Sequence, residues 1–522
     1  MPWTLDITTF DVGQGESSFI NADDGNGQSR TMIIDGGLQA EGVVVNNNVD
    51  DIIGEGTPVD HILVSHYDDD HCEGIMALLA ADNYSSICLA VATGTVDGAK
   101  IFDSKAKRVA AGTAAACAVF LGAYDRPGGD QDKYQARLAA NSAAQLVDNN
   151  TPLATAAQIG IKEAELITKY NANPKLIPAN SKKKRRDVSK SAGFAVADAL
   201  AGNNTEAEVL EITEESIFDE LQSFITENYR FNTHGRYNTT NILDTGNTPG
   251  LPDGYINLVE GKVHMNSNVW IQAPGITRQR STPNLGAEIL WNSGPQAQLA
   301  PAGSPMIFTM ARRSQVWNWN GVLGHAIDNN NDCFGVILRF NKFFFYTGGD
   351  LIAEGEDIIA QKVRNVGLPD PNSNNPFPVA TRIAAFKCGH HGAETSTSQT
   401  FLDRALPKAA LISCGDNSYE HPRQVVVNRL HAMGGLSYFY LTGCPKYRNY
   451  IPATYTPMGN QLTTPGNKSR VAGGIAVPPG DISLTIDTAG SDAVNADDRI
   501  FYMTYYDYDA PIPGYRIETI TF

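Results

Sequence analysis

The chain has 522 residues, of which 42% are hydrophobic and 19% are charged, and its formal net charge is −17. This length exceeds what one compact core supports, so we expect two or three domains, or one domain with large insertions. An acidic surface repels phosphate and argues against general affinity for a nucleic-acid backbone. It does not exclude a nuclease, because a local metal cluster can reverse the field inside one cleft.

Cysteine usage and hydropathy favour a cytoplasmic protein. The cysteines are scattered singly, with no CxxC pair: Cys72, Cys88, Cys117, Cys333, Cys388, Cys414 and Cys444. An odd, dispersed set is typical of reduced thiols buried as small apolar residues. No run of 18 apolar residues occurs, and residues 1–10 lack a basic region followed by an apolar core, so we expect neither a membrane span nor a signal peptide.

Residues 1–98 predict the first half of an α/β core domain. Residues 5–20 predict two strands separated by a turn at Gly13 and Gly15, and residues 31–34 and 61–65 predict two more strands. Residues 73–81 have the apolar spacing of a helix. A strand that runs into a charged loop and then a helix is an arrangement in which ligands gather at the strand's carboxyl end.

Residues 99–302 predict a large insertion. Its first part, residues 99–230, contains Ala-rich and acidic segments that indicate helices, with a basic run at 182–186. Its second part, residues 231–302, is rich in Gly, Pro, Asn and Thr, with short strand-like pieces.

The α/β pattern returns at residues 303–445, the predicted second half of the core. Strands are expected at 306–310, 333–340, 343–347, 383–387 and 409–413, and a helix near 422–433. Residues 446–522 predict an extension with strands at 482–485 and 500–505.

Four potential ligands follow the strand that ends at Ser65. His66, Asp68 and Asp70 alternate, so in an extended loop they converge, while His71 reaches the same point from the helix start. Imidazoles with carboxylates suit Zn²⁺ or Mn²⁺. The alternative is a solvated acidic loop with incidental histidines, but two His and three Asp within residues 66–71 argue against it.

The motif HxDxDH at residues 66–71 resembles the HxHxDH signature of the metallo-β-lactamase superfamily, with Asp68 in place of a second His. In this it resembles the branch that contains the hydrolase domain of ComEC, a DNA-internalisation competence protein. Five further segments resemble that branch in order: DVGQGE at 11–16, NDCFGVIL at 331–338, FYTGGD at 345–350, KCGHHG at 387–392, and SCGDN at 413–417 followed by His421-Pro422. They cover roughly residues 5–95 and 305–445, and imply an αββα sandwich with a large, mainly helical insertion.

The resemblance also implies a ligand set for two divalent metal ions. Asp350 would bridge both ions, with Asp70, His71 and His390 completing one site. His66 and Asp68 would begin the other. For its third ligand, His234, His264 and His325 lie in sequence without a match to the family, so either His421 substitutes or the site is more open. His391 would be a ligand or a proton donor to the leaving group, and we favour the donor. His61 and His431 are expected to be ordinary structural or surface residues.

A dinuclear site predicts hydrolysis, because two ions a few ångströms apart lower the pKa of a bridging water and neutralise charge on the reacting oxygens. Asp70 beside that water is the natural orienting or general-base carboxylate. Thr395, Ser396 and Asn417 are candidate substrate-binding residues, although the first two can equally form a turn.

We expect a phosphodiesterase or nuclease acting on DNA, RNA or nucleotides. One alternative is a hydrolase of a small ester, lactam or thioester; another is an effector subunit of a defence assembly whose insertion binds a protein partner or a second copy. The basic run at 182–186 fits a phosphate-contacting arm, but such runs are more often solvated loops. Arg312, Arg313, Trp317 and Trp319 fit either a cationic and aromatic cleft wall or core.

Overall fold

The structure is a computed structural model that describes residues 2–93, 231, 233–246, 250–266, 269–273, 275–324, 330–415, 419, 421–443, 480–507 and 514–522. The expected helices at 99–230, the basic run, His325 and Asn417 lie outside the described residues. The chain forms two compact units: the first comprises Met1–Leu78, Thr239–Asp253 and Gln279–Phe522, and the second comprises Leu79–Asn238 and Gly254–Arg278. The domain boundaries expected at 98, 302 and 445 stay predictions.

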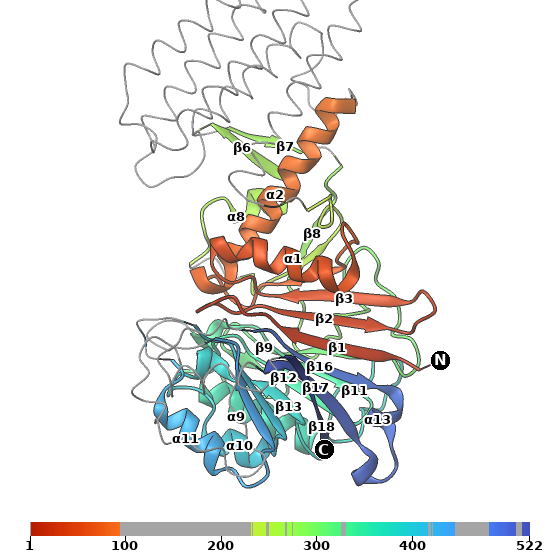
Figure 1. The fold of residues 1–522 in the computed structure, drawn as a ribbon, viewed down its shortest axis with the longest axis vertical. Coiled ribbons are helices and arrows are strands. Elements are labelled where there is room, and N and C mark those ends of the chain that lie inside the picture. The colour runs from red at the N-terminus through yellow and green to blue at the C-terminus, as the bar shows by residue number, and fades with distance from the viewer. Residues whose placement is uncertain are drawn as a thin grey trace, which may run out of the picture. The chain divides into compact units, whose positions relative to one another are not determined.

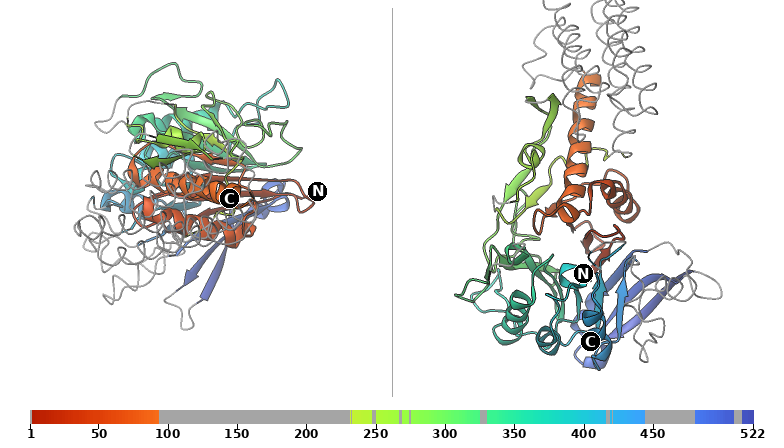
Figure 2. Two further views of the ribbon diagram at one scale, coloured as in Figure 1. Left: turned by 90° about the horizontal axis from the view of Figure 1, so that it is seen from above. Right: turned by 90° about the vertical axis from the view of Figure 1, so that its left-hand side faces the viewer.

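Nine strands of the described chain form one mixed sheet in the first unit, in the order β18-β17-β16-β1-β2-β3-β4-β5-β8. Their bounds are β1 Thr4–Thr9, β2 Ser18–Asp23, β3 Ser29–Ile34, β4 His61–Leu63, β5 Asn241–Leu243, β8 Gln279–Ser281, β16 Ile482–Asp487, β17 Ile500–Asp507 and β18 Gly514–Thr521. The strands from β18 to β3 are antiparallel, whereas β3, β4, β5 and β8 run parallel. Figures 1 and 2 show the C-terminal strands in blue next to the red N-terminal strands.

A second sheet of the first unit has, within the described residues, the order β10-β9-β11-β12-β13-β14-β15. Its strands are β9 Met306–Arg312, β10 Gln315–Val316, β11 Gly335–Phe340, β12 Phe343–Thr347, β13 Ala385–Lys387, β14 Ala409–Ile412 and β15 Tyr438–Leu441. The run from β12 to β15 is parallel. Each sheet therefore contains a parallel run, and the carboxyl ends of such strands are where ligands bind in α/β proteins.

The two sheets share one hydrophobic core. Leu5 and Ile7 of β1 and Phe308 and Met310 of β9 belong to the same buried cluster. Burying this apolar surface is the main favourable contribution to folding. The first unit is thus a mixed α/β structure built on two large sheets.

The described helices of the first unit include α1 Gly42–Ile53, the start of α2 Asp69–Thr93, α9 Ala353–Asn365, α10 Gln399–Ala405 and α11 Gln424–Ala432. The second unit contains the rest of α2, α8 Tyr255–Val259, and the hairpin β6 Lys262–Asn266 with β7 Val269–Gln272. Within it, Arg278 and Asp82 form an ion pair of 2.5 Å with both side chains buried. Within the described part, no helix combines the length and apolar character needed to cross a membrane.

Most strands expected from the sequence are present. The helix predicted at 73–81 is present but longer, since α2 begins at Asp69, within the segment 66–71 that was expected to hold the ligands. The strand expected from Cys333 begins instead at Gly335, because the short 3-10 turn η4 (Asn330–Asp332) precedes it. Four cysteines, Cys72, Cys333, Cys388 and Cys414, are free and buried as expected.

Candidate metal centre

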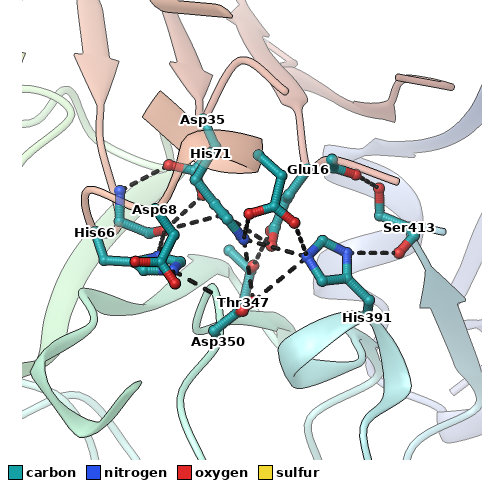
Figure 3. A network of polar contacts seen from close by, with 12 residues as sticks. Glu16, Asp35, His66, Asp68, His71, Thr347, Asp350, His391 and Ser413 are labelled. Atoms are coloured by element: carbon teal, nitrogen blue, oxygen red, sulfur yellow. Dashed lines mark hydrogen bonds and ion pairs between the residues drawn. The ribbon is translucent and has the colours of Figure 1, made fainter. Parts of the chain in front are cut away.

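The candidate site lies where parallel strands of both sheets end. Asp35 follows β3, His66 follows β4, Asp350 follows β12, and His391 follows β13. Figure 3 shows their side chains meeting in one polar cluster with His71, from the first turn of α2, at its centre. Residues that lie far apart in the sequence therefore come together in space, because the carboxyl ends of parallel strands from both sheets meet at this point.

Glycines allow three backbone segments to pack around the first ligand loop. A Cβ on Gly74 would lie 1.8 Å from Gly36 O, and one on Gly15 would lie 2.7 Å from Asp70 O. These close approaches are secured by hydrogen bonds from Gly36 N to His71 O (2.9 Å) and from Gly74 N to Gly37 O (2.8 Å). The ligand loop is therefore held by main chain on both sides.

Asp350 lies between four imidazoles. Its Oδ1 is 3.1 Å from His71 Nε2 and 3.6 Å from His391 Nε2. Its Oδ2 is 3.4 Å from His390 Nε2 and 3.9 Å from His66 Nε2. The Asp350 side chain is only 5% exposed, so each carboxylate oxygen faces its own pair of rings rather than water.

Three of these rings are held in position by contacts to Nδ1, the nitrogen that points away from Asp350. His71 Nδ1 donates to Asp35 Oδ2 at 2.9 Å, and His391 Nδ1 donates to Ser413 O at 2.9 Å. His66 Nδ1 lies 3.0 Å from Ser65 Oγ, whose own proton goes to Asp35. A neutral ring that donates from Nδ1 keeps Nε2 as an acceptor, and this is how metal-ligating histidines are usually held.

Asp70 and Asp68 face the same cluster with different exposure. Asp70 Oδ2 lies 3.3 Å from His391 Nε2, and the side chain is 25% exposed. Asp68 Oδ2 lies 3.5 Å from His66 Nε2, but its side chain is 57% exposed. Asp70 therefore belongs to the buried side of the site and Asp68 to its solvent side.

The donor set fits divalent cations. Three groups of donor atoms within 4.8 Å of one another occur among the described residues: His66, His71 and Asp350; Asp70, His71 and His391; and Glu16, Asp35 and His71. In the third group, His71 offers Nδ1, which already donates to Asp35. We therefore infer that this group orients His71 and that the first two groups are the candidate metal sites. His66 Nε2 and Asp350 Oδ1 are each buried without a well-aligned hydrogen bond within the described residues, a cost that a cation beside each atom would remove.

The electrostatics point the same way. Burial alone would lower the pKa of His71, but the surrounding carboxylates outweigh burial and raise it well above its ordinary value. Burial likewise would raise the pKa of Asp350, but the facing imidazoles outweigh it and hold that pKa well below its usual range. His71 Nε2 and His391 Nε2 are only 3.2 Å apart, a contact that a shared cation would stabilise.

His391, rather than His390 as we expected, lies with Asp70 and His71. His391 groups with Asp70 and His71, whereas His390 faces Asp350 Oδ2 on the side of His66. Both residues have positive φ, 48° and 50°, a backbone strain that is common at functional sites. The two rings face different oxygens of Asp350, although the residues are adjacent in sequence.

The other described histidines, like His390, do not belong to the three donor groups, and the expectation that His421 is a metal ligand stays a prediction. His421 lies next to His390, with ring centroids 5.1 Å apart, and burial, then the two neighbouring imidazoles, lower its pKa to about 3. His61 is buried in β4 with Nε2 3.0 Å from Leu290 O. His234 and His264 belong to the second unit, and His431 lies in α11.

Of the candidate substrate-binding residues, Ser396 is fully buried, and its hydroxyl lies 2.5 Å from Gly389 O and 2.9 Å from Ala393 O, either of which can accept its proton. It therefore holds the turn η5 (Gly389–Gly392). Thr395 is exposed, and its carbonyl accepts from Ala353 N at 2.8 Å. Neither contact places a hydroxyl at Asp350.

A buried second layer was missed by sequence reasoning. Lys387 and Glu16 form an ion pair with both side chains fully buried, and Thr347 Oγ1 donates to the same carboxylate at 3.2 Å. Glu16 Oε2 lies 3.8 Å from His71 Nδ1. The available signal was Lys387 between Phe386 and Cys388, a charge in an apolar run that needs a buried partner.

Glu356 of α9 forms part of the same layer beneath η5. Its Oε2 accepts from Thr397 N at 2.5 Å. Burial raises the pKa of Glu356 to about 8, so this carboxyl is held largely protonated at neutral pH.

Trp317 and Trp319 of the expected cleft wall are partly buried and pack on the core.

No family model matches the chain. The chain is similar to the competence protein ComA of Neisseria gonorrhoeae (30% identity over 145 residues, 26% of this chain and 19% of the relative). It is also similar to the ComE operon protein 3 of Bacillus subtilis (40% over 102 residues, 19% and 11%) and to recombination protein 2 of Haemophilus influenzae (28% over 133 residues, 24% and 15%). The matches thus span less than one fifth of the length of these curated relatives. They support the resemblance to competence proteins of the ComEC type.

Proposed function

We propose that the chain is a metal-dependent phosphodiesterase of the metallo-β-lactamase fold that cleaves nucleic acid. The observation that carries this is the arrangement at Asp350, whose two carboxylate oxygens each face a pair of imidazole nitrogens. One carboxylate that presents one oxygen to each of two donor sets is what two neighbouring divalent ions require.

His71, His391 and Asp70 would hold one ion on the Oδ1 side of Asp350. His66, His390 and the more exposed Asp68 would hold the other on the Oδ2 side. This assignment gives the second site the third ligand that the sequence left open. When bound, such ions lower the pKa of water and neutralise charge on phosphoryl oxygens.

The chain's own residues orient this centre. Asp35 and Ser413 fix the His71 and His391 rings through their Nδ1 protons. Because His391 donates from Nδ1 to a carbonyl, its Nε2 is the nitrogen that would bind an ion, so we assign it as a ligand rather than as the proton donor. Asp70 is partly exposed beside the same space, where it can orient or deprotonate the attacking water.

Nucleic acid is proposed as substrate because the relatives are named competence and recombination proteins. The acidic net charge of −17 favours single strands over long duplex, since duplex carries the higher charge density. The cytoplasmic location stays a prediction from cysteine usage.

Hydrolysis of bis-p-nitrophenyl phosphate and of nitrocefin, each with and without Mn²⁺ or Zn²⁺, tests the proposal. We expect metal-dependent cleavage of the phosphodiester and no turnover of the lactam. Single-stranded DNA, duplex DNA and RNA then define the preferred polymer. Metal-dependent nitrocefin hydrolysis without phosphodiester cleavage would contradict the proposal and support the small-molecule alternative.

A further inference from the structure

The hairpin between β9 and β10 has an unusual turn. Its two central residues, Arg313 and Ser314, have φ values of 51° and 58°. Hairpin turns with two positive φ values are normally made by Asn-Gly or Asp-Gly, because other side chains are strained there. Keeping arginine and serine at these positions costs free energy, which suggests that their side chains are needed.

This turn is attached to the segment beside His390. Ser314 N donates to Asn331 O at 3.0 Å, and the Ser314 hydroxyl donates to Asp332. In the same segment, Asn330 Nδ2 lies 3.1 Å from His390 Nδ1. The position of the turn is therefore coupled to one of the proposed metal ligands.

The guanidinium groups of Arg312 and Arg313 are held by main-chain carbonyls. Arg312 donates to Thr282 O and Pro283 O at 3.0 and 2.7 Å. Arg313 donates to Thr245 O at 2.7 Å and also to Gly246 O. Within the described residues neither forms an ion pair with a carboxylate, so both positive charges remain uncompensated.

Arg280 brings a third guanidinium group to the same strand end, that of β5. It is paired with Asp244 at 2.6 Å and lies 3.3 Å from the hydroxyl of Tyr67, the residue between His66 and Asp68. Its side chain is 32% exposed. Asp244, which pairs with Arg280, and Thr245, which accepts from Arg313, are adjacent residues. The end of β5 therefore positions both Arg280 and Arg313.

We propose that Arg312, Arg313 and Arg280 form an arginine rim that binds a backbone phosphate next to the phosphodiester being cleaved. The proposal rests on the phosphodiesterase function and narrows it: the substrate is a nucleic-acid strand with more than one phosphate. Guanidinium groups held in a fixed orientation match phosphate oxygens geometrically. A local rim of this kind gives an acidic protein an anion-binding surface only at its site.

The test compares Arg312→Gln and Arg313→Gln with the wild type by fluorescence anisotropy on a labelled single-stranded DNA oligonucleotide, in EDTA and over a range of salt concentrations. Each lost phosphate contact should weaken binding about 10-fold at low salt and reduce the slope of log K against log salt by about one. Arg382→Gln is the matched control, because Arg382 also donates to a main-chain carbonyl, that of Leu406, but precedes the amino end of β13. It should bind like the wild type.

A second variant separates charge from loop anchoring. Arg313→Lys keeps the charge but loses the planar fork that reaches the Thr245 and Gly246 carbonyls. The rim predicts that its salt slope stays near the wild-type value. A slope as low as that of Arg313→Gln, an unchanged slope in both glutamine variants, or an equal loss in Arg382→Gln would overturn the proposal.

Hydrolysis distinguishes failure of the rim from failure of the proposed function. With Mn²⁺, the glutamine variants should lose at least about 10-fold more kcat/KM on the oligonucleotide than on bis-p-nitrophenyl phosphate, which has a single phosphate. Equal losses on both substrates would overturn the rim while leaving the phosphodiesterase intact. Absence of hydrolysis by the wild type, with the predicted salt slopes, would overturn the phosphodiesterase and leave the anion-binding rim.

Discussion

His71 Nε2 lies 3.1 Å from Asp350 Oδ1. The two residues come from different sheets of the first unit, one after β4 and one after β12. Their contact joins the two ligand loops into one cluster. It also explains why the field of the carboxylates acts so strongly on this ring, whose pKa is raised well above its ordinary value despite complete burial.

Replacing Asp35 with Asn should weaken metal binding without unfolding the protein. Asn fits the same space and tolerates the positive φ of 56° at this position, but it no longer accepts the His71 proton as a carboxylate does. Loss of such a partner typically costs about 10- to 100-fold in metal affinity or activity. Titration with Zn²⁺ or Mn²⁺ checks this. Unchanged affinity in Asp35→Asn would mean that His71 does not ligate an ion.

His391→Asn and His390→Asn should each remove a different ion. The first removes a ligand on the Oδ1 side of Asp350 and the second removes one on the Oδ2 side. Each variant should therefore retain about one metal ion where the wild type retains two. Metal analysis after gel filtration measures this. If His390→Asn still held both ions, His390 would not be a metal ligand.

Gly74→Ala should disrupt the ligand loop. The new methyl group would lie 1.8 Å from Gly36 O, and because the neighbour is main chain, the segments must move apart. Overpacking of this kind costs about 1–3 kcal/mol, and shifts the helix start that carries His71. The control is Gly434→Ala, where nothing lies within 4 Å of the added carbon. Equal unfolding free energies and metal affinities for the two variants would contradict the proposed clamp.

Glu356 should make stability fall as the pH rises. Its pKa is raised from 4.5 to about 8 by burial, so between these values the folded protein keeps a proton that the unfolded chain releases. Its contribution to stability is complete below the unfolded pKa and is lost as the pH rises through the folded one. Relative to Glu356→Gln, which cannot ionise, the wild type should lose on the order of 3 kcal/mol from pH 5 to pH 8, at about 1.4 kcal/mol per pKa unit.

Urea denaturation of both proteins at the two pH values, in EDTA, checks this prediction. All other titrating groups are shared by the wild type and Glu356→Gln, so their effect on the free energy of unfolding cancels in the difference between the two proteins. If the difference between wild type and variant stayed constant from pH 5 to pH 8, Glu356 would have to be ionised throughout the range.

Sequence patterns predicted the strands around the site because short apolar runs ended by glycine are local signals. They also predicted that His66, Asp70 and His71 would lie together, since all three follow one strand. The pairing of β16 with β1 was not predictable from either segment, because residues at opposite ends of the chain carry no local sign of their partner.

The positions of His390 and His391 could not be predicted for a different reason. In adjacent residues, the direction of each ring depends on backbone angles, and here both have positive φ, which no periodicity encodes. Asp35 was not among the expected site residues. Its contact with His71 depends on the packing of Gly36 against Gly74, a relation between two loops that the sequence alone does not reveal.

The most direct test of the account is metal content in the wild type and in Asp350→Asn, measured by mass spectrometry after incubation with Mn²⁺ or Zn²⁺, with phosphodiester hydrolysis measured on the same samples. Asp69→Asn is the control, since Asp69 is an exposed carboxylate in the same loop. We predict two bound ions and hydrolysis in the wild type and the control, and loss of at least one ion and of hydrolysis in Asp350→Asn. Full metal content and full rate in Asp350→Asn would contradict the account.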